Sequence, residues 1–204
     1  MEETSLRDDI ADCEKLLIGI GEEWREAKNE EVPGAYDVLA DLIGDKDSFI
    51  VTVNTDAAIF KSRLDPRRIT APCGNVTWRQ CEKACTKDIW EPGELPDDVC
   101  PHCGAPLTGN TVEAGTYIEE GYLPQWQQYT AWLAQTLNKK LLILELGVGF
   151  QYPTVIRWPF EKTAVLNNKA KMYRISQSFP QISAELKGKA IPLAINSVEF
   201  IRGL

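Results

Sequence analysis

The chain has 204 residues, of which 44% are hydrophobic and 25% are charged, and its formal net charge at pH 7 is -8. A chain of this length forms one domain or one domain with a smaller insert, and its negative charge argues against nucleic-acid binding because phosphate backbones repel it. The most apolar stretch, 141–150, is shorter than the roughly twenty apolar residues of a membrane helix, and the N-terminus has no apolar signal region. We therefore expect a cytoplasmic protein with no nucleic-acid or membrane partner.

The first part of the chain alternates predicted strands and helices. The apolar run 15–21 predicts a buried strand that ends in glycines. Segment 33–44 has apolar residues at helical spacing, with Pro33 at its start and Gly44 at its end. The β-branched run 48–56 predicts a second strand. A short helical pattern with a possible cap at Thr4 or Ser5 precedes them, so the order is helix, strand, helix, strand.

The middle of the chain, 73–123, is rich in Cys, Pro, Gly and acidic residues and has no long periodic segment, so we expect loops with short strands. Periodicity then returns. The predicted elements are a helix over 124–138, a strand over 139–150, a helix within 153–168 that Pro159 begins or kinks, a strand over 170–176, a short helix or turn over 179–188, a strand over 190–195 and a last helix capped by Asn196.

Alternating strands and helices predict an α/β fold, a Rossmann-like parallel sheet with helices on both faces, here with a small zinc-ribbon insert. We expect the sheet domain to comprise 1–75 and 124–204 and the insert to comprise 76–123. Ligands of such sheets bind beyond the carboxyl ends of the strands. In this chain those ends carry the segments "GIGEEW", "NTD", "GVGF" and "SQSF".

Four of the six cysteines have the spacing of a metal site. Cys81 and Cys85 form C-x3-C, and Cys100 and Cys103, after 14 further residues, form C-x2-C. Two close pairs separated by a loop give zinc four thiolates in a closed, structural site. The alternative is four unmetallated buried thiols, but this segment has too few apolar residues to fold without a metal.

Several short motifs, taken in chain order, resemble those of one protein family. They are "TVNTD" at 52–56, "APCGNVTWRQC" at 71–81, "CPHCGAPL" at 100–107, "NTVEAGT" at 110–116 and "LELGVGF" at 144–150. In the sirtuins, the NAD-dependent protein deacylases, similar segments read T-Q-N-I-D, H-G before the first zinc cysteine, a second zinc knuckle, V-V-x-F-G-E and G-T-S. The chain thus resembles a divergent, shortened sirtuin over nearly its whole length.

The resemblance implies a function and a set of site residues. It implies a structural zinc, NAD as cofactor, and either deacylation of an acyl-lysine protein or transfer of ADP-ribose to another acceptor. It places Cys73, Asn54 and Asp56 at catalytic positions. The residues that it implies in cofactor binding are Gly19, Gly21, Asn54, Asp56, Gly147, Gly149 and Ser176.

The chain departs from the sirtuin pattern where the family's chemistry is carried out. Cys73 stands where sirtuins have a histidine base, and an unperturbed thiol, with a pKa of about 8.5, acts as a nucleophile rather than as a base. Glu22 and Glu23 follow the first glycines, where two carboxylates would repel a pyrophosphate, and the sequence has no D-F-R. Ser176 stands where an Asn usually meets the ribose. These departures predict weak or altered activity.

Structural alternatives stay open for most of these residues. Asn54 and Asp56 could cap a strand end, the glycines could permit tight turns, and Glu22 and Glu23 could form a solvated acidic turn. Cys73 could be a nucleophile toward a different nucleotide or a small apolar filler. The alternative for the whole chain is a catalytically inactive binding or regulatory module that keeps the fold and the zinc.

Overall fold

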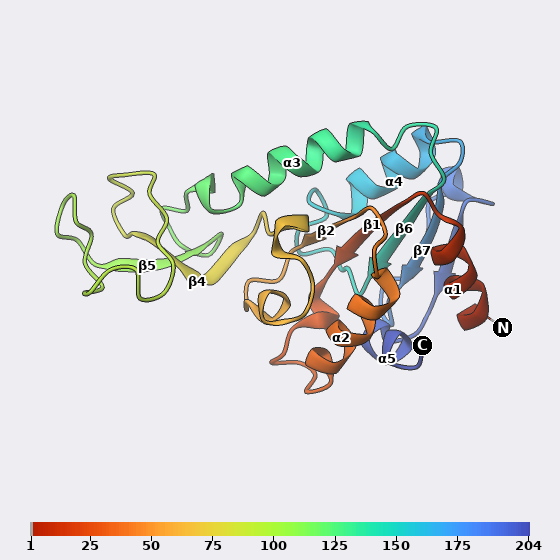
Figure 1. Cartoon of the computed structure of the whole chain (residues 1–204), viewed down its shortest axis with the longest axis horizontal. Helices are drawn as coiled ribbons and strands as arrows, with labels where there is room; N and C mark the ends of the chain where they lie inside the picture. The colour runs from red at the N-terminus through yellow and green to blue at the C-terminus, as the bar shows by residue number, and fades with distance from the viewer. Residues whose placement is uncertain (1) are drawn as a thin grey trace.

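The computed structural model describes residues 2–204, which form a six-stranded parallel sheet and a separate two-stranded hairpin (Figure 1). The strands of the large sheet are β1 (Lys15–Ile20), β2 (Ser48–Thr52), β3 (Ile69–Thr70), β6 (Leu141–Leu146), β7 (Lys171–Ile175) and β8 (Ala190–Leu193). Five of them confirm predicted strands. The two-residue strand β3 is too short to give a pattern in the sequence.

The strand order, β3-β2-β1-β6-β7-β8, is that of the Rossmann fold. The chain builds outward from β1 through β2 to β3, crosses back, and builds outward from β6 in the other direction. β1 and β6 therefore meet where the direction of winding reverses. Ile20 pairs with both Thr52 and Leu146, so β1, β2 and β6 end level with one another at this point.

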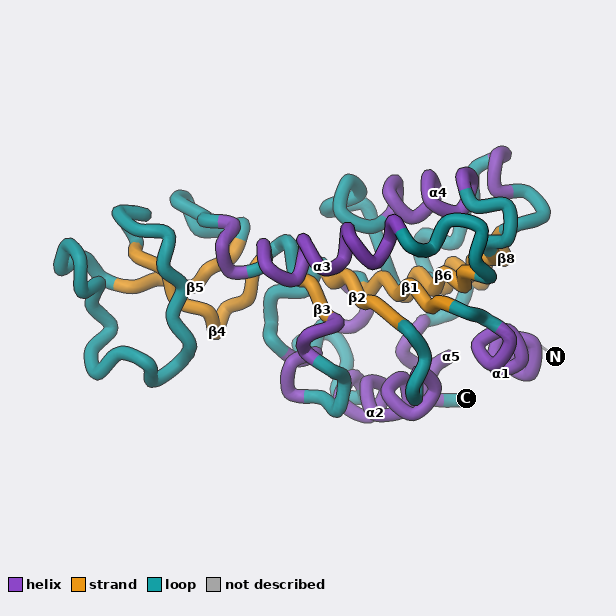
Figure 2. Tube along the Cα trace, turned by 45° about the horizontal axis from the view of Figure 1, so that its top comes forward, coloured by secondary structure: helices purple, strands orange, loops and turns teal. Residues whose placement is uncertain are grey.

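Helices cover both faces of the sheet (Figure 2). One face carries α1 (Glu2–Asp12), α2 (Val32–Ile43) and α5 (Ser197–Arg202), and the other carries α3 (Leu123–Ala134) and α4 (Arg157–Leu166). Alternate residues of a strand point to opposite faces. Leu16, Ile18 and Ile20 accordingly pack in one core cluster and Leu17 in the other. The prediction of a parallel sheet covered on both faces is confirmed.

Pro159 and Asn196 both lie at helix starts, as predicted. Pro159 lies in the first turn of α4, where its missing N–H removes no helical hydrogen bond, and the Asn196 side chain accepts from Val198 N at 3.0 Å and so caps α5. The helix predicted over 124–138 instead ends at Ala134, and Leu137 beyond it is 61% exposed. None of the helices in residues 2–204 has the length and apolarity that a bilayer crossing requires.

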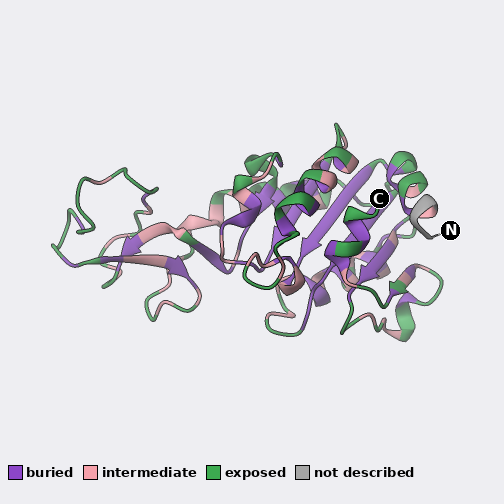
Figure 3. Cartoon of the chain, turned by 90° about the horizontal axis from the view of Figure 1, so that it is seen from below, coloured by how far each residue is buried: buried purple, intermediate pink, exposed green. Residues whose placement is uncertain are grey.

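The hairpin of β4 (Gly74–Cys81) and β5 (Leu107–Thr111) projects from the sheet domain together with its loops (Figure 3). We call residues 76–123 the cysteine module. Its own core consists of Cys81, Trp90, Cys100, Ala105 and Leu107. Two of these five residues belong to the cysteine quartet, so the module buries little apolar surface apart from its cysteines. A core this small needs a cross-link, such as a structural metal, to stay folded.

Candidate functional site

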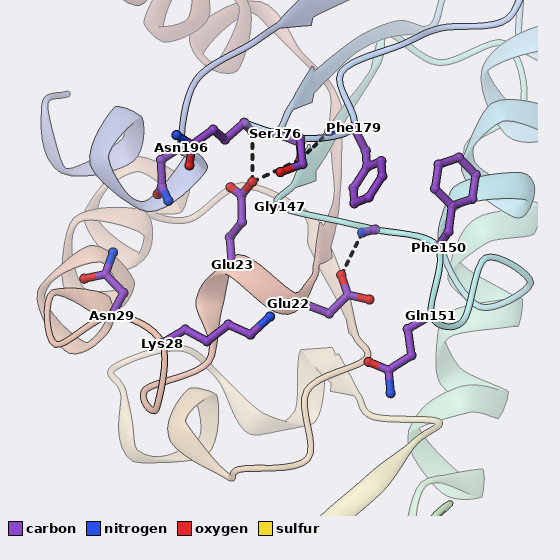
Figure 4. Close-up of a pocket in the computed structure, with 13 residues that line it drawn as sticks. Glu22, Glu23, Lys28, Asn29, Gly147, Phe150, Gln151, Ser176, Phe179 and Asn196 are labelled. Atoms are coloured by element: carbon purple, nitrogen blue, oxygen red, sulfur yellow. Dashed lines mark hydrogen bonds between the residues drawn. The ribbon is translucent and has the colours of Figure 1, made fainter.

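A cleft of about 520 Å³ opens at the carboxyl edge of the sheet (Figure 4). Its walls are the segments that follow β1, β6, β7 and β8, on both sides of the reversal between β1 and β6. This is the position at which open α/β sheets bind ligands. The lining residues are Glu22, Glu23, Lys28, Asn29, Gly147, Gly149, Phe150, Gln151, Ser176, Gln177, Ser178, Phe179 and Asn196.

The cleft contains some of the predicted cofactor residues and not others. Gly147, Gly149 and Ser176 line it, whereas the other predicted positions are not among its lining residues. Gly19 lies inside β1 beneath α4, and a side chain there would come within 2.5 Å of Ile156 Cγ2, so packing explains this glycine.

Asn54 and Asp56 accept and donate hydrogen bonds that join two chain segments near the cleft. Asn54 is 3% exposed; its amide donates to Gly21 O at 2.8 Å, and its Oδ1 accepts from Arg25 Nε at 3.2 Å. Asp56 accepts from the backbone N–H groups of Glu26 at 3.1 Å and Ala58 at 3.2 Å. These contacts favour the structural interpretation of both residues, since they tie the segment after β1 to the end of β2.

Gly21 is required by the close approach of two strand ends. A Cβ at this position would lie 2.3 Å from Val148 Cα and 2.4 Å from Gly147 O, which are backbone atoms that cannot rotate away. We expect Gly21→Ala to destabilise the protein by about 3 kcal/mol, the upper part of the range for overpacked sites, and to distort the cleft. Urea denaturation would measure the loss, and Gly115→Ala, where a Cβ meets nothing within 4 Å, is the matched control. Equal stability of the two variants would contradict this account.

Glu22 and Glu23 are bound across the cleft, so the interpretation of a solvated acidic turn is wrong. Glu22 Oε2 accepts from Gly149 N at 2.7 Å (Figure 4). Glu23 accepts four hydrogen bonds: from Ser176 Oγ at 3.0 Å and Gln177 N at 2.8 Å on one oxygen, and from Ser197 N at 2.8 Å and Ser197 Oγ at 2.7 Å on the other. Glu23 therefore joins the segment after β1 to the ends of β7 and β8.

Two of the cleft glycines make room for these carboxylates. Gly147 has a φ of +64°, and a Cβ on it would meet Glu23 Cβ at 2.5 Å. A Cβ on Gly149 would meet Glu22 Oε2 at 3.1 Å. The resemblance implies that both glycines contact the cofactor, and in the structure glutamate side chains lie against them.

A buried ion network beneath the cleft was not predicted from the sequence. Glu145, inside β6, accepts from Arg174 at 2.7 and 2.8 Å and from Arg157 at 3.3 Å. Arg157 also donates to Val148 O at 3.3 Å and to Phe179 O at 3.2 Å, which belong to two walls of the cleft. Burial raises the pKa of Glu145, and the neighbouring arginines counter this effect. The network fixes the loops that shape the cleft.

Cys73 is buried in the core cluster beneath α3 and α4, and its side chain is 1% exposed. Loss of solvation raises the pKa of its thiol to about 12, although Arg25 partly opposes this. At neutral pH the thiol is therefore protonated. It is neither a base nor an activated nucleophile, which favours the interpretation of a small apolar filler.

We expect Cys73 to resist iodoacetamide at pH 7.5 in the folded protein, because alkylation requires an accessible thiolate. Peptide mapping by mass spectrometry would measure the modified fraction, and the denatured protein is the control in which Cys73 should react fully. Rapid alkylation of folded Cys73 at neutral pH would contradict the burial and restore the nucleophile hypothesis.

The four clustered cysteines have the geometry of a tetrahedral metal site. Their sulfur atoms all lie within 4.8 Å of one another, with 3.6 Å between Cys81 and Cys103 and 3.5 Å between Cys85 and Cys100. Zinc–sulfur bonds of about 2.3 Å require sulfur separations of about 3.8 Å. Backbone N–H groups of Cys85 and Lys83 lower the pKa of Cys81, whereas the neighbouring sulfur atoms raise the pKa of Cys85, so the four thiols need a cation to ionise together. The cluster fits a structural zinc and leaves no ligand position open for water.

Known proteins resemble this chain in sequence and in fold. No family model matches the chain. A protein ADP-ribosyltransferase of Staphylococcus aureus (strain Mu50 / ATCC 700699) is 26% identical over 183 residues, which cover 78% of this chain and 58% of that protein. The chain thus spans a little more than half the length of this relative.

Solved structures share the fold over almost the full chain. Sir2Tm bound to a propionylated peptide has a TM-score of 0.64 at 14% identity, and the match covers 100% of this chain and 97% of that one. A Sir2 homologue in complex with NAD has a TM-score of 0.59 at 15% identity, and the match covers 98% of this chain and 91% of that one. The chain therefore has the sirtuin fold, in a divergent and shortened version.

Proposed function

We propose that the chain binds NAD in the cleft at the carboxyl edge of the sheet and transfers its ADP-ribose to a nucleophile on a protein. The observation that carries this proposal is the position of the cleft, at the reversal of strand order in a fold shared with a Sir2 homologue solved with NAD. The name of the Staphylococcus aureus relative, an ADP-ribosyltransferase, supports the same reaction class.

The environment of Cys73 favours ADP-ribosyl transfer over deacylation. Sirtuin deacylation uses a base to deprotonate a ribose hydroxyl after nicotinamide has left, and a base works best with a pKa near the working pH. A buried thiol with a pKa of about 12 does not meet this requirement. Transfer to an external nucleophile omits that step. We expect weak deacylation of an acyl-lysine peptide and stronger transfer to an acceptor protein.

Several lining residues suit a dinucleotide. Phe150 and Phe179 are 54% and 39% exposed, and their rings meet edge to face at 5.3 Å, which provides an aromatic wall for a base. Lys28 is the one cation among the lining residues, and its ammonium suits a phosphate. The Ser176 hydroxyl already donates to Glu23 at 3.0 Å and accepts from Phe179 N at 3.2 Å, so it shapes the cleft wall and offers a ligand no free donor. Bound NAD would supply an electrophilic ribose carbon as nicotinamide leaves.

Nicotinamide release tests the proposal. The zinc-loaded protein is incubated with NAD, with and without an acetyl-lysine peptide, and with a mixture of acceptor proteins. Chromatography measures nicotinamide, and mass spectrometry measures ADP-ribose added to protein. We expect nicotinamide to be released. We also expect the amount of ADP-ribosylated protein to exceed the amount of deacetylated peptide. Release no greater than in a heat-denatured control would contradict the proposal.

The hydrogen bonds of Asn54 favour a second candidate, a module that binds NAD without cleaving it. Both ends of its side-chain amide are engaged within the protein, which leaves less capacity for a ligand. Stoichiometric NAD binding without nicotinamide release would identify this function, whereas turnover would exclude it.

A further inference from the structure

We propose that Glu22 is a built-in competitor for the phosphate of the ligand: its carboxylate occupies the amide of Gly149, and an anionic ligand must displace it. This inference rests on the proposed nucleotide site and adds its regulation. It predicts that the Glu22 carboxylate weakens the binding of phosphate-bearing ligands, and that removal of this one charge strengthens that binding.

The Glu22 carboxylate occupies a backbone donor that a phosphate could use. Glu22 Oε2 accepts from Gly149 N at 2.7 Å, a short, charge-assisted bond to a backbone donor at a strand end. Backbone N–H groups that point into a cleft are the usual partners of phosphate oxygens. The carboxylate resembles a phosphate in its charge and its acceptor oxygens, so the two compete for the same donor.

Glu22 is easier to displace than its neighbour Glu23. Glu22 has one hydrogen bond in this structure, whereas Glu23 has four to Ser176, Gln177 and Ser197. Each charge-assisted hydrogen bond must be broken before a side chain can move away. Glu23 is therefore a fixed clamp between strand ends, and Glu22, which is half-buried, is the side chain that a ligand can displace.

The side chains that line the cleft carry a net negative charge. Its lining contains two carboxylates, Glu22 and Glu23, against one ammonium, that of Lys28. Figure 4 shows the Lys28 side chain extending toward Glu22. Displacement of Glu22 would leave Lys28 facing the incoming phosphate. While Glu22 stays at Gly149, it both blocks the amide and repels the ligand.

Calorimetric titration of two ligands separates these effects. ADP-ribose carries a pyrophosphate, and adenosine carries the same base and a ribose without phosphate. The zinc-loaded wild type and Glu22→Gln are titrated with each, and Glu185→Gln, an exposed acid outside the cleft, is the control for net charge. We expect Glu22→Gln to lower the Kd for ADP-ribose at least tenfold and to change the Kd for adenosine less than twofold. We expect Glu185→Gln to change neither Kd.

The outcomes separate this inference from the proposed function. If the wild type binds ADP-ribose and Glu22→Gln binds it no tighter, the inference is wrong and the proposed function stands. If Glu22→Gln binds ADP-ribose tenfold tighter but neither protein releases nicotinamide from NAD, the inference holds and the enzymatic proposal fails. If neither binds ADP-ribose, both are wrong. Should Glu22→Gln fold poorly by thermal melting, Glu22→Ala replaces it with the same expected gain.

Discussion

Removal of the metal is expected to unfold the cysteine module while the six-stranded sheet stays folded. The module's core holds only Trp90, Ala105 and Leu107 besides two of the cysteines, so its apolar burial cannot offset the entropy of ordering the loops. Zinc binding to such sites contributes about 10 to 16 kcal/mol at pH 7. This contribution is lost on chelation, and the sheet domain keeps its two separate core clusters.

Limited trypsin digestion with and without a strong chelator measures this effect. We expect new cleavage after Lys83 and Lys87, which lie in the module, and unchanged helical circular dichroism. Cys100→Ser should mimic chelation and hold less than one zinc per chain, whereas Cys13→Ser, outside the cluster, should keep a full equivalent. If the module resists trypsin equally well without metal, the four cysteines stabilise it as buried thiols and bind no structural metal.

Glu145→Gln is expected to destabilise the sheet domain by about 3 to 5 kcal/mol, the usual cost of removing one member of a buried ion network. Glu145 is fully buried and compensates the charges of Arg174 and Arg157, whose side chains are 1% and 4% exposed. The amide keeps the shape but removes the carboxylate that pairs with Arg157, and it leaves Arg174 only the partly exposed Glu161 as a counter-charge. For a chain of this size, each kcal/mol lowers the melting temperature by about 2 to 4 °C.

Differential scanning calorimetry measures the loss, and Glu161→Gln is the matched control. Glu161 also pairs with Arg174, at 2.7 Å, but its side chain is 23% exposed, so water can replace it and we expect a loss of about 1 kcal/mol. Similar melting temperatures for the two variants would show that the buried network is not a major source of stability. Glu145→Gln is also expected to loosen the cleft wall at Phe179, because Arg157 donates to the Phe179 carbonyl oxygen.

The sequence predicts most of the fold because its signals are local. Buried parallel strands appear as continuous apolar runs, such as 15–20 and 141–146, and helices carry apolar residues at helical spacing. β3 is missed since two residues give no period, and its pairing with Ile50 and Val51 depends on residues nearly twenty positions away. The cysteine quartet is readable because zinc fixes the spacing of its ligands.

The candidate site is less predictable because its contacts join distant segments. Glu22 and Glu23 read as an acidic turn, and nothing near them in the chain shows that their partners are Gly149, Ser176 and Ser197. Glu145 reads as a single charge in an apolar strand. A signal does exist there, since a carboxylate in a buried strand requires a buried cation, but the sequence does not say which arginine provides it.

A nucleotide bound in the cleft at the carboxyl edge of the sheet shifts the resonances of the amides around it, and an amide-resolved NMR titration detects these shifts residue by residue. The zinc-loaded, nitrogen-15-labelled protein is titrated with NAD and with ADP-ribose. We predict saturable shifts at the amides of Gly149, Phe150, Gln177 and Phe179, larger in Glu22→Gln than in the wild type. Shifts confined to other parts of the chain, or no shifts with either ligand in either protein, would contradict the account.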